Sequence, residues 1–173
     1  MACSQTLSGI PRDCESNAGG LKAVYIANYD DVTAVTLDST GGSISGITMA
    51  SSAKFKAFYF KPGQATLTLT GVFNEAAEYA GEDGILAMQF GRMDTTKRVQ
   101  VAAVSVGELA VIVKDNNGKN WLLGKDAPVL RNGGESAFGA QKSDFNHYGV
   151  QLHSVDNQLP YEVSDEILAG IIG

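Results

Sequence analysis

The sequence is poor in the residue types that define several classes of protein. Its 173 residues include two cysteines, four prolines, one tryptophan and two histidines. No run of 18 apolar residues occurs, so no membrane-spanning helix is predicted. A chain of this length can bury a sizeable core without metals or disulfides. We therefore expect one globular domain, with or without extended arms.

Charge is scarce and has an excess of one sign. Charged residues make up 18% of the chain, and its net charge is −6. A surface that binds nucleic-acid phosphates needs clustered Lys and Arg, so the net charge argues against this class. The net charge does not exclude a negative surface past which nucleic acid moves without binding. Low charge fits a surface covered by other subunits and equally a small β protein rich in Ser and Thr.

Catalytic and metal-binding motifs are absent from the sequence. There is no Walker loop, no G-x-G-x-x-G, no H-E-x-x-H and no G-x-S-x-G. His147 and His153 lie on one predicted strand, six residues apart, which places the imidazoles roughly 20 Å from each other. They cannot share a metal ion. We expect no enzymatic activity, no cofactor and no metal site.

Residues 1–20 are predicted to form an N-terminal arm, because Gly9, Pro11 and the pair Gly19–Gly20 interrupt any regular element. Leu7 and Ile10 are candidate subunit-contact residues in this arm. The arm has no apolar segment typical of a secretory signal. A disulfide between Cys3 and Cys14 is possible, but reduced thiols are favoured without an export signal.

Residues 21–163 are predicted to form the β domain. Twenty glycines and many Thr, Ser and Val favour strands joined by turns. In residues 64–70, Ala and Leu alternate strictly with Thr, which indicates a half-buried antiparallel strand. We expect this strand to form a hairpin with residues 54–60 across the turn at Pro62–Gly63. Other strands are expected at 22–28, 32–37, 43–49, 85–93, 109–114, 120–124, 128–130, 144–155 and 159–163.

Residues 71–83 form an acidic excursion between two strands, with four acids and no base. We interpret it as a long hairpin tip or a helical turn, exposed to solvent. Long loops in compact domains often carry function. Glu75, Glu78 and Tyr79 are therefore candidate subunit-contact residues. The Gly-rich loop at 131–142 is a further candidate contact segment.

Residues 94–124 are predicted to form the rigid support of the domain. Asp94 or Thr95 can cap a helix that ends before Gly107. The spacing i, i+3, i+4, i+7 of Val99, Ala102, Ala103 and Val106 predicts its buried stripe. A nearly all-apolar strand at 109–114 follows. The Asn117–Gly118 step predicts a tight turn with positive φ at both positions, before a strand that carries Trp121.

Residues 164–173 are predicted to form an acidic and then apolar C-terminal tail. Ile167, Leu168 and Ile171 lie on a short helix in this interpretation, and they are candidate subunit-contact residues. The helix docks either on its own domain or on a neighbouring subunit. The predicted fold class is thus mainly β: an antiparallel β-sandwich or barrel with one flanking α-helix and long loops or arms.

Several segments together resemble a family of structural proteins from tailed phages of Bacteroidetes-type hosts. They are CSQTLSGIPRDCESNAGGLKAVYIANYDDVTAV, ISGITM, VIVKDNNGKNWLLG, DFNHYGVQL and LPYEV, and they cover most of the chain. Within that group the order of elements is similar to that of tail tube proteins, which have a β-sandwich or barrel, one flanking helix and a long excursion between strands. No single motif defines that family.

The resemblance implies a non-enzymatic virion protein, assembled in the bacterial cytoplasm and located in the phage tail. Tail tube subunits stack as hexameric rings around a channel. The implied partners are other copies of the chain, other virion proteins, and double-stranded DNA that passes without specific binding; no membrane is involved. An acidic channel repels DNA phosphates, and edge strands paired across subunits close an inner barrel.

Two other functions remain open at this stage. A capsid decoration or auxiliary protein would share the β content and the lack of an active site. A carbohydrate-binding module or hydrolase on a β-sandwich would need a carboxylate pair with aromatic platforms, for which Glu75, Glu78 and Tyr79 are the nearest candidates.

Overall fold

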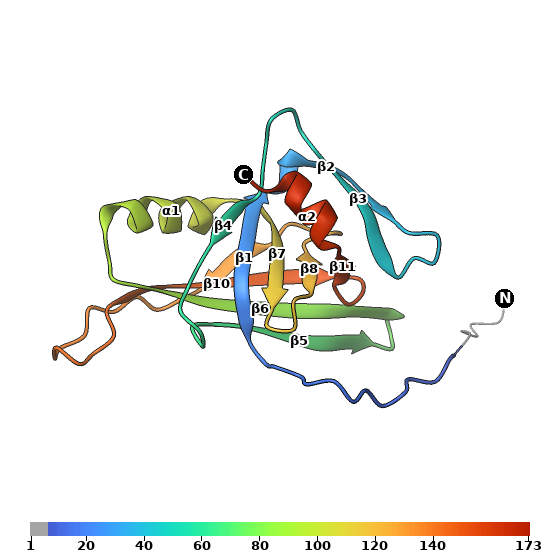
Figure 1. The fold of residues 1–173 in the computed structure, drawn as a ribbon, viewed down its shortest axis with the longest axis horizontal. Coiled ribbons are helices and arrows are strands. Elements are labelled where there is room, and N and C mark those ends of the chain that lie inside the picture. Colours follow the sequence, from blue (N-terminus) through green and yellow to red (C-terminus); the bar gives the residue numbers. More distant parts are fainter. Residues whose placement is uncertain (1–6) are drawn as a thin grey trace.

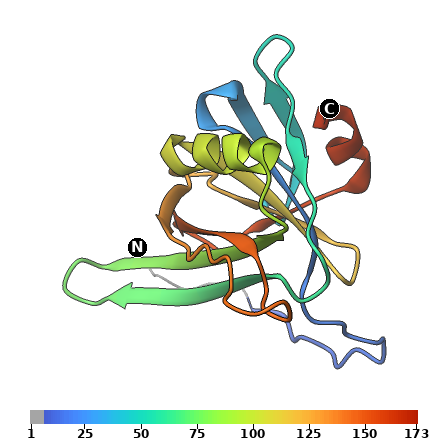
Figure 2. The same cartoon turned by 90° about the vertical axis from the view of Figure 1, so that its left-hand side faces the viewer.

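The computed structural model describes residues 7–173, which form two β-sheets packed face to face with two α-helices (Figure 1). The strands of the two sheets cross steeply, as in orthogonal sheet packing (Figures 1 and 2). Neither sheet closes into a barrel within these residues. The predicted fold class, a mainly β sandwich with a flanking helix, is confirmed.

The larger sheet has seven strands in the order β2-β3-β11-β8-β7-β1-β4. All its pairs are antiparallel except β11 with β3. β7 and β1 are neighbouring interior strands of this sheet and are buried on both faces. The strands are β1 (Leu21–Asn28), β2 (Val32–Leu37), β3 (Ser43–Met49), β4 (Lys56–Phe58), β7 (Leu109–Asp115), β8 (Asn120–Leu123) and β11 (Tyr161–Val163).

The smaller sheet has four antiparallel strands in the order β5-β6-β10-β9. β5 and β6 form a long hairpin whose turn lies beyond the body of the domain (Figure 2). The predicted excursion at 71–83 is thus a hairpin tip and not a helical turn. The strands are β5 (Ala65–Asn74), β6 (Tyr79–Gly91), β9 (Leu130–Gly133) and β10 (His147–Asp156).

Two α-helices cover different parts of the sheets, and a short 3-10 turn η1 (Tyr29–Asp31) joins β1 to β2. The first helix, α1 (Thr95–Val106), begins at Asp94, whose side chain accepts from the Lys97 amide at 2.8 Å. It lies over the four-stranded sheet, beside the seven-stranded one (Figures 1 and 2). The second helix, α2 (Asp165–Ile171), is capped by Ser164 and packs on the seven-stranded sheet.

The core consists of two apolar clusters on opposite faces of β1 and β7. One lies between the sheets and under α1, and it includes Val24, Val111, Leu86 and Leu152. The other lies under α2. It contains Ala23, Tyr25, Ala27, Ile44, Phe55, Ala110, Ile112, Leu122, Val163, Leu168 and Ile171. The nearly all-apolar strand predicted at 109–114 is confirmed, and Val111 and Val113 within it are fully buried in the core. Trp121 is partly buried against the first cluster.

The predicted hairpin between residues 54–60 and 64–70 is wrong. β4 pairs with β1 in the larger sheet, whereas β5 pairs with β6 in the smaller one. Phe55 is fully buried in the cluster under α2 and holds this segment on the larger sheet. The turn at Pro62–Gly63 therefore joins the two sheets. The ten-residue register of β5 with β6 satisfies more backbone groups than the short predicted hairpin.

The predicted buried stripe of α1 is also wrong, although the helix itself is confirmed. Val99, Ala102, Ala103 and Val106 all face solvent. Val104 is buried and Val101 packs on the core instead. Valines occur on both faces of this helix, so periodicity alone could not select the buried one.

Two predicted turn conformations differ from those observed. Gly107 ends α1 with φ −83°, so no left-handed residue closes the helix there. At the 115–118 turn only Gly118 has a positive φ, which is the pattern of a type I turn followed by a bulge. The asparagines of this turn hold the base of the arm instead: Asn116 donates to Gly19, and Asn117 accepts from the amide of Ala18.

An ion pair at the start of α2 predicts sensitivity to acid. Lys114 and Asn120 donate to Asp165 at 2.7 and 2.9 Å, and these bonds lower the pKa of Asp165. A carboxylate whose pKa is lower in the folded than in the unfolded state stabilises the fold above about pH 4, and this contribution is lost as the pH falls through the folded pKa. Asp165→Asn should lower the free energy of unfolding at pH 7 and weaken its decline as the pH falls below about 4, measured by urea denaturation. Glu166→Gln, at an exposed neighbouring residue, is the matched control. An equal decline in the free energy of unfolding at acid pH for D165N and the natural chain would contradict the role given to Asp165.

Candidate assembly surface

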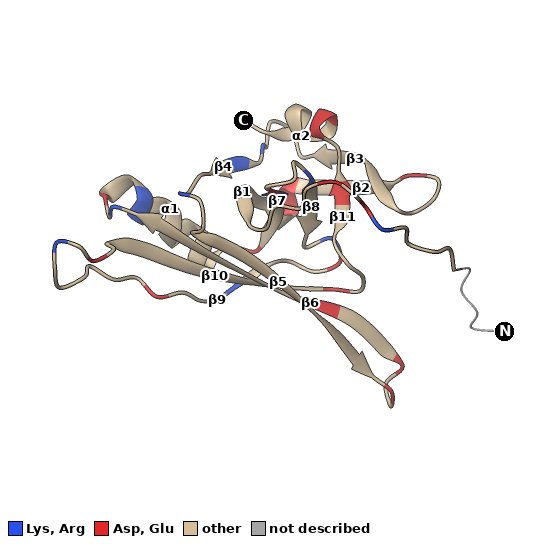
Figure 3. Ribbon diagram, turned by 60° about the horizontal axis from the view of Figure 1, so that its bottom comes forward, with Lys and Arg blue, Asp and Glu red and all other residues tan. Residues whose placement is uncertain are grey.

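The outer face of the four-stranded sheet is polar but almost uncharged. Three cross-strand rows lie on this face: Thr66–Ala87–Gln151, Thr68–Ile85–His153 and Thr70–Asp83–Val155. Asp83 is the only charged residue in these rows. Figure 3 shows this sheet mostly tan, with blue at β9 and red toward the end of the hairpin. The cation of β9 is Arg131, which donates to Ser105 of α1 and so lies toward the helix. This face therefore offers hydroxyl, amide and imidazole groups, and no cation, to whatever lies against it.

The period-2 pattern of the sequence produces this face. In β5 the alternate residues Ala65 and Leu67 point into the core, so the threonines between them point out. The same alternation in β10 buries Val150 and Leu152 and leaves Gln151 and His153 half-exposed. His153 Nε2 lies 3.4 Å from the Asp83 carboxylate. His147, at the other end of β10, stacks on Phe145.

The two outer strands of this sheet have one unpaired backbone edge each within the described chain. β5 is ten residues long, and β9 is four residues long with an irregular register against β10. A long exposed edge is a template for pairing with another chain. In β5, charged residues, proline and bulges, the usual devices that prevent such pairing, are absent.

The far end of the β5–β6 hairpin extends past the core and carries exposed apolar and acidic side chains. We call residues 73–79 the hairpin tip. Phe73 is 73% exposed. Glu75 and Glu78 are exposed in the turn, and Tyr79 is partly buried. Three candidate residues from the sequence thus lie together at one end of the molecule.

The backbone of the tip is strained at one residue. The Glu78 amide donates to the Glu75 carbonyl, which closes the turn, and Glu78 has φ +51°. Glycine or asparagine adopts this left-handed conformation at lower cost. A glutamate in this position therefore keeps its charge at the expense of local stability.

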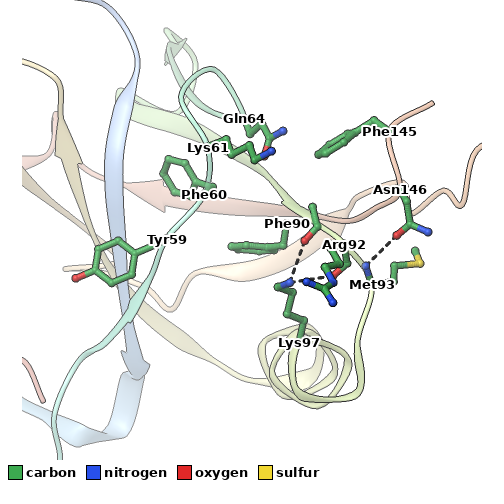
Figure 4. Close-up of a pocket in the computed structure, with 11 residues that line it drawn as sticks. Tyr59, Phe60, Lys61, Gln64, Phe90, Arg92, Met93, Lys97, Phe145 and Asn146 are labelled. Carbon is green, nitrogen blue, oxygen red and sulfur yellow. Dashed lines mark hydrogen bonds between the residues drawn. The ribbon is translucent and has the colours of Figure 1, made fainter. Parts of the chain in front are cut away.

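A pocket of about 650 Å³ lies at the opposite end of the same hairpin (Figure 4). Its aromatic lining comes from the 59–60 segment, β6 and the loop before β10, and its polar lining includes Gln64 Oε1, which has no hydrogen-bond partner among the described residues. We call it the base pocket. It is lined by Tyr59, Phe60, Lys61, Gln64, Phe90, Gly91, Arg92, Met93, Lys97, Phe145 and Asn146.

Three cationic side chains line the base pocket, and they differ in availability. Lys97 donates to the carbonyls of Gly91 and Arg92 and to Asp94, so its ammonium is fully used. The hydrogen bond from the Lys97 amide, and after it the one from the Lys97 ammonium, lower the pKa of Asp94. Lys61 and Arg92 make no ion pair with any described residue. Arg92 has φ +60°, so this position too carries a charge where glycine would be less strained.

The remaining candidate contact residues fall into two groups. Leu7 and Ile10 are 91% and 97% exposed on the extended arm, which leaves the body of the domain (Figure 1). Cys14 is exposed on the same arm. Cys3, the other cysteine of the possible disulfide, lies outside the described residues. In contrast, Leu168 and Ile171 are buried against the chain's own core and Ile167 packs beside them. Of the two predicted alternatives, the tail therefore docks on its own domain.

The sequence indicated the tip but not the base pocket. The pocket combines residues from the 59–64 segment, the end of β6, the start of α1 and the loop before β10. These segments meet only because β5 pairs with β6, which the sequence did not predict. One signal was available: residues 62–91 contain no Lys or Arg, yet Lys61 and Arg92 flank this span directly.

Residues 7–173 hold no group of three His, Cys, Asp or Glu side chains arranged for a metal ion. Within the same range, no helix has the length and apolar character needed to cross a membrane. Comparisons with protein-family models, curated proteins and solved structures gave no match.

The strained tip predicts that one substitution stabilises the domain. Glu78→Gly should raise the free energy of unfolding by up to about 1 kcal/mol, because glycine accepts a positive φ without a steric penalty. Ser51→Gly, at the positive-φ residue of a different turn, is the control and should behave similarly. Urea denaturation of both variants measures the effect. Destabilisation by E78G alone would show that the Glu78 side chain supports the tip.

Proposed function

We propose that this chain is a tail tube subunit that stacks as hexameric rings around a channel for double-stranded DNA. The observation that carries the proposal is the outer face of the four-stranded sheet, which is polar, without Lys or Arg in its cross-strand rows, and bounded by an unpaired ten-residue edge at β5. The resemblance to tail tube proteins supplies the assembly and the host.

The edges provide a route to ring closure. Pairing the β5 edge of one subunit with the β9 edge of the next is a head-to-tail contact, and such contacts generate rings when the rotation closes. The four-stranded sheets would then line a continuous inner barrel, which removes both exposed edges. In this arrangement α1 and the seven-stranded sheet lie outside, because they cover the other face of the four-stranded sheet (Figure 1).

The chemistry of the proposed channel wall suits passage of DNA without binding. DNA affinity comes mainly from cations that displace counterions from phosphates. Threonine, glutamine and a single aspartate offer no such term, so DNA would slide past this wall. Electron microscopy of the purified protein tests the assembly: rings or tubes are expected, whereas trimers or monomers at high concentration favour a capsid decoration or auxiliary protein.

A basic channel wall should convert the tube into a DNA-binding one. Thr66→Lys with Thr68→Lys places two ammonium groups per subunit on the proposed wall. Assemblies formed in the presence of linear DNA should then retain it, and retention should fall as salt rises. Thr36→Lys with Thr48→Lys, on β2 and β3 of the other sheet, adds the same two ammonium groups, so it is the matched control and should retain none. Equal DNA retention by the T36K/T48K control and the T66K/T68K variant would place the wall elsewhere.

A further inference from the structure

We propose that the hairpin tip of one copy docks into the base pocket of a second copy in the next ring, and that this contact drives stacking. The arrangement of the two copies in successive rings rests on the proposed function. The contact between tip and pocket follows from the two surfaces themselves. The tip presents Phe73, Glu75 and Glu78, and the base pocket presents aromatic walls with Lys61 and Arg92.

The two surfaces are complementary in charge. The hairpin between residues 62 and 91 carries four acids and no base, with Glu75 and Glu78 at its turn. Lys61 and Arg92 lack an ion-pair partner among the described residues. An arginine guanidinium is suited to bidentate pairing with a carboxylate. Opposite charges orient such a contact and suppress wrong ones, while burial of apolar surface holds it.

The exposed aromatic side chain of the tip also suits the aromatic-lined base pocket. A pocket of about 650 Å³ with Tyr59, Phe60, Phe90 and Phe145 in its lining can receive an aromatic side chain. Phe73 is the large aromatic residue that the tip exposes to solvent. Aromatic anchors in pockets with a charged rim are typical of the residues that dominate protein interfaces.

The tip cannot reach the base pocket of its own chain. Gln64 lines the pocket and Asn74 precedes the turn, so ten strand residues separate them, or about 35 Å. Figure 1 shows the hairpin turn and the start of α1 at opposite ends of the four-stranded sheet. A contact between opposite ends of one molecule is heterologous, and repetition of it produces an open-ended stack. The axial repeat of that stack cannot exceed the distance from tip to pocket, about 40 Å including the turn.

Backbone strain supports the assignment independently. The described residues contain three non-glycine residues with positive φ, and two of them are Glu78 in the tip and Arg92 in the pocket. Strained residues of this kind cluster at functional sites. Each keeps a charged side chain where glycine would cost less, and the two charges are opposite.

Reciprocal charge reversal tests the contact. The tip-reversed variant is Glu75→Lys with Glu78→Lys, and the pocket-reversed variant is Lys61→Glu with Arg92→Glu. Each variant alone should lose stacking, because its tip and pocket then carry the same sign. An equimolar mixture should stack again, since each tip meets a pocket of opposite sign. The matched controls Asp30→Lys with Glu166→Lys, and Lys22→Glu with Arg98→Glu, change net charge equally and should stack like the natural chain.

The readouts separate this inference from the proposed function. Circular dichroism first establishes that each variant folds, and then electron microscopy counts rings per stack and measures the axial repeat. Single rings for each variant and stacks in the mixture support the contact. Stacks from either variant alone, no recovery in the mixture, or a repeat well above 40 Å would overturn it.

If the natural chain forms no rings, the proposed function fails, and sedimentation velocity of the two reversed variants still decides the contact. Association in the mixture, absent from each component alone, supports it. No association overturns it, and a closed dimer that grows no further overturns the stacking role. Phe73→Ser keeps every charge and should abolish stacking in the natural background, which separates the aromatic anchor from the ion pairs.

Discussion

The structure depends on burial of β7 and its partner β1 on both faces. Val111 and Val113 pack between the two sheets, while Ala110 and Ile112 pack under α2. A strand that is buried on both sides needs a cover on each side, so the four-stranded sheet with α1 and the C-terminal helix are both required. This requirement explains why the tail at 164–173 belongs to the domain and why the core is divided into two clusters rather than one.

That rigid centre leaves the candidate assembly surface at the periphery of the domain. The β5–β6 hairpin is anchored at its base, where Ala65 and Leu86 are buried, whereas Phe73 and the turn lie past the core. An isolated two-stranded ribbon is at best marginally stable in water. The β5–β6 hairpin extends beyond the body of the domain because β5 pairs with β6 over a long register and β6 pairs in turn with β10. Another copy of the chain can cover its exposed aromatic side chain and the unpaired backbone edge of β5.

The sequence predicted the elements better than their pairing. Strand positions, the helix at 95–106 and the two-sided burial of 109–113 follow from local periodicity, which short segments encode. The partner of residues 54–60 does not, because Phe55 and the β6 strand decide it through contacts distant in sequence. The buried stripe of α1 was predicted wrongly because Val99 and Val101 both fit an apolar face. The base pocket was not predicted because it, too, depends on contacts distant in sequence: its walls meet only after β5 and β6 pair.

The few charges of the chain are distributed unevenly along the β5–β6 hairpin. Between Lys61 and Arg92 the chain has acids and no bases, and this span is the hairpin itself. Antiparallel pairing brings Lys61 and Arg92 to the base of the hairpin and leaves the acids of the turn at the tip. The hairpin is therefore positively charged at one end and negatively charged at the other. A molecule with opposite ends of opposite sign favours head-to-tail over head-to-head association, because like ends repel. The same arrangement keeps cations off the sheet's outer face. In the assembly that we propose, the absence of bases from a thirty-residue span would therefore both set the direction of stacking and keep the enclosed surface from binding DNA.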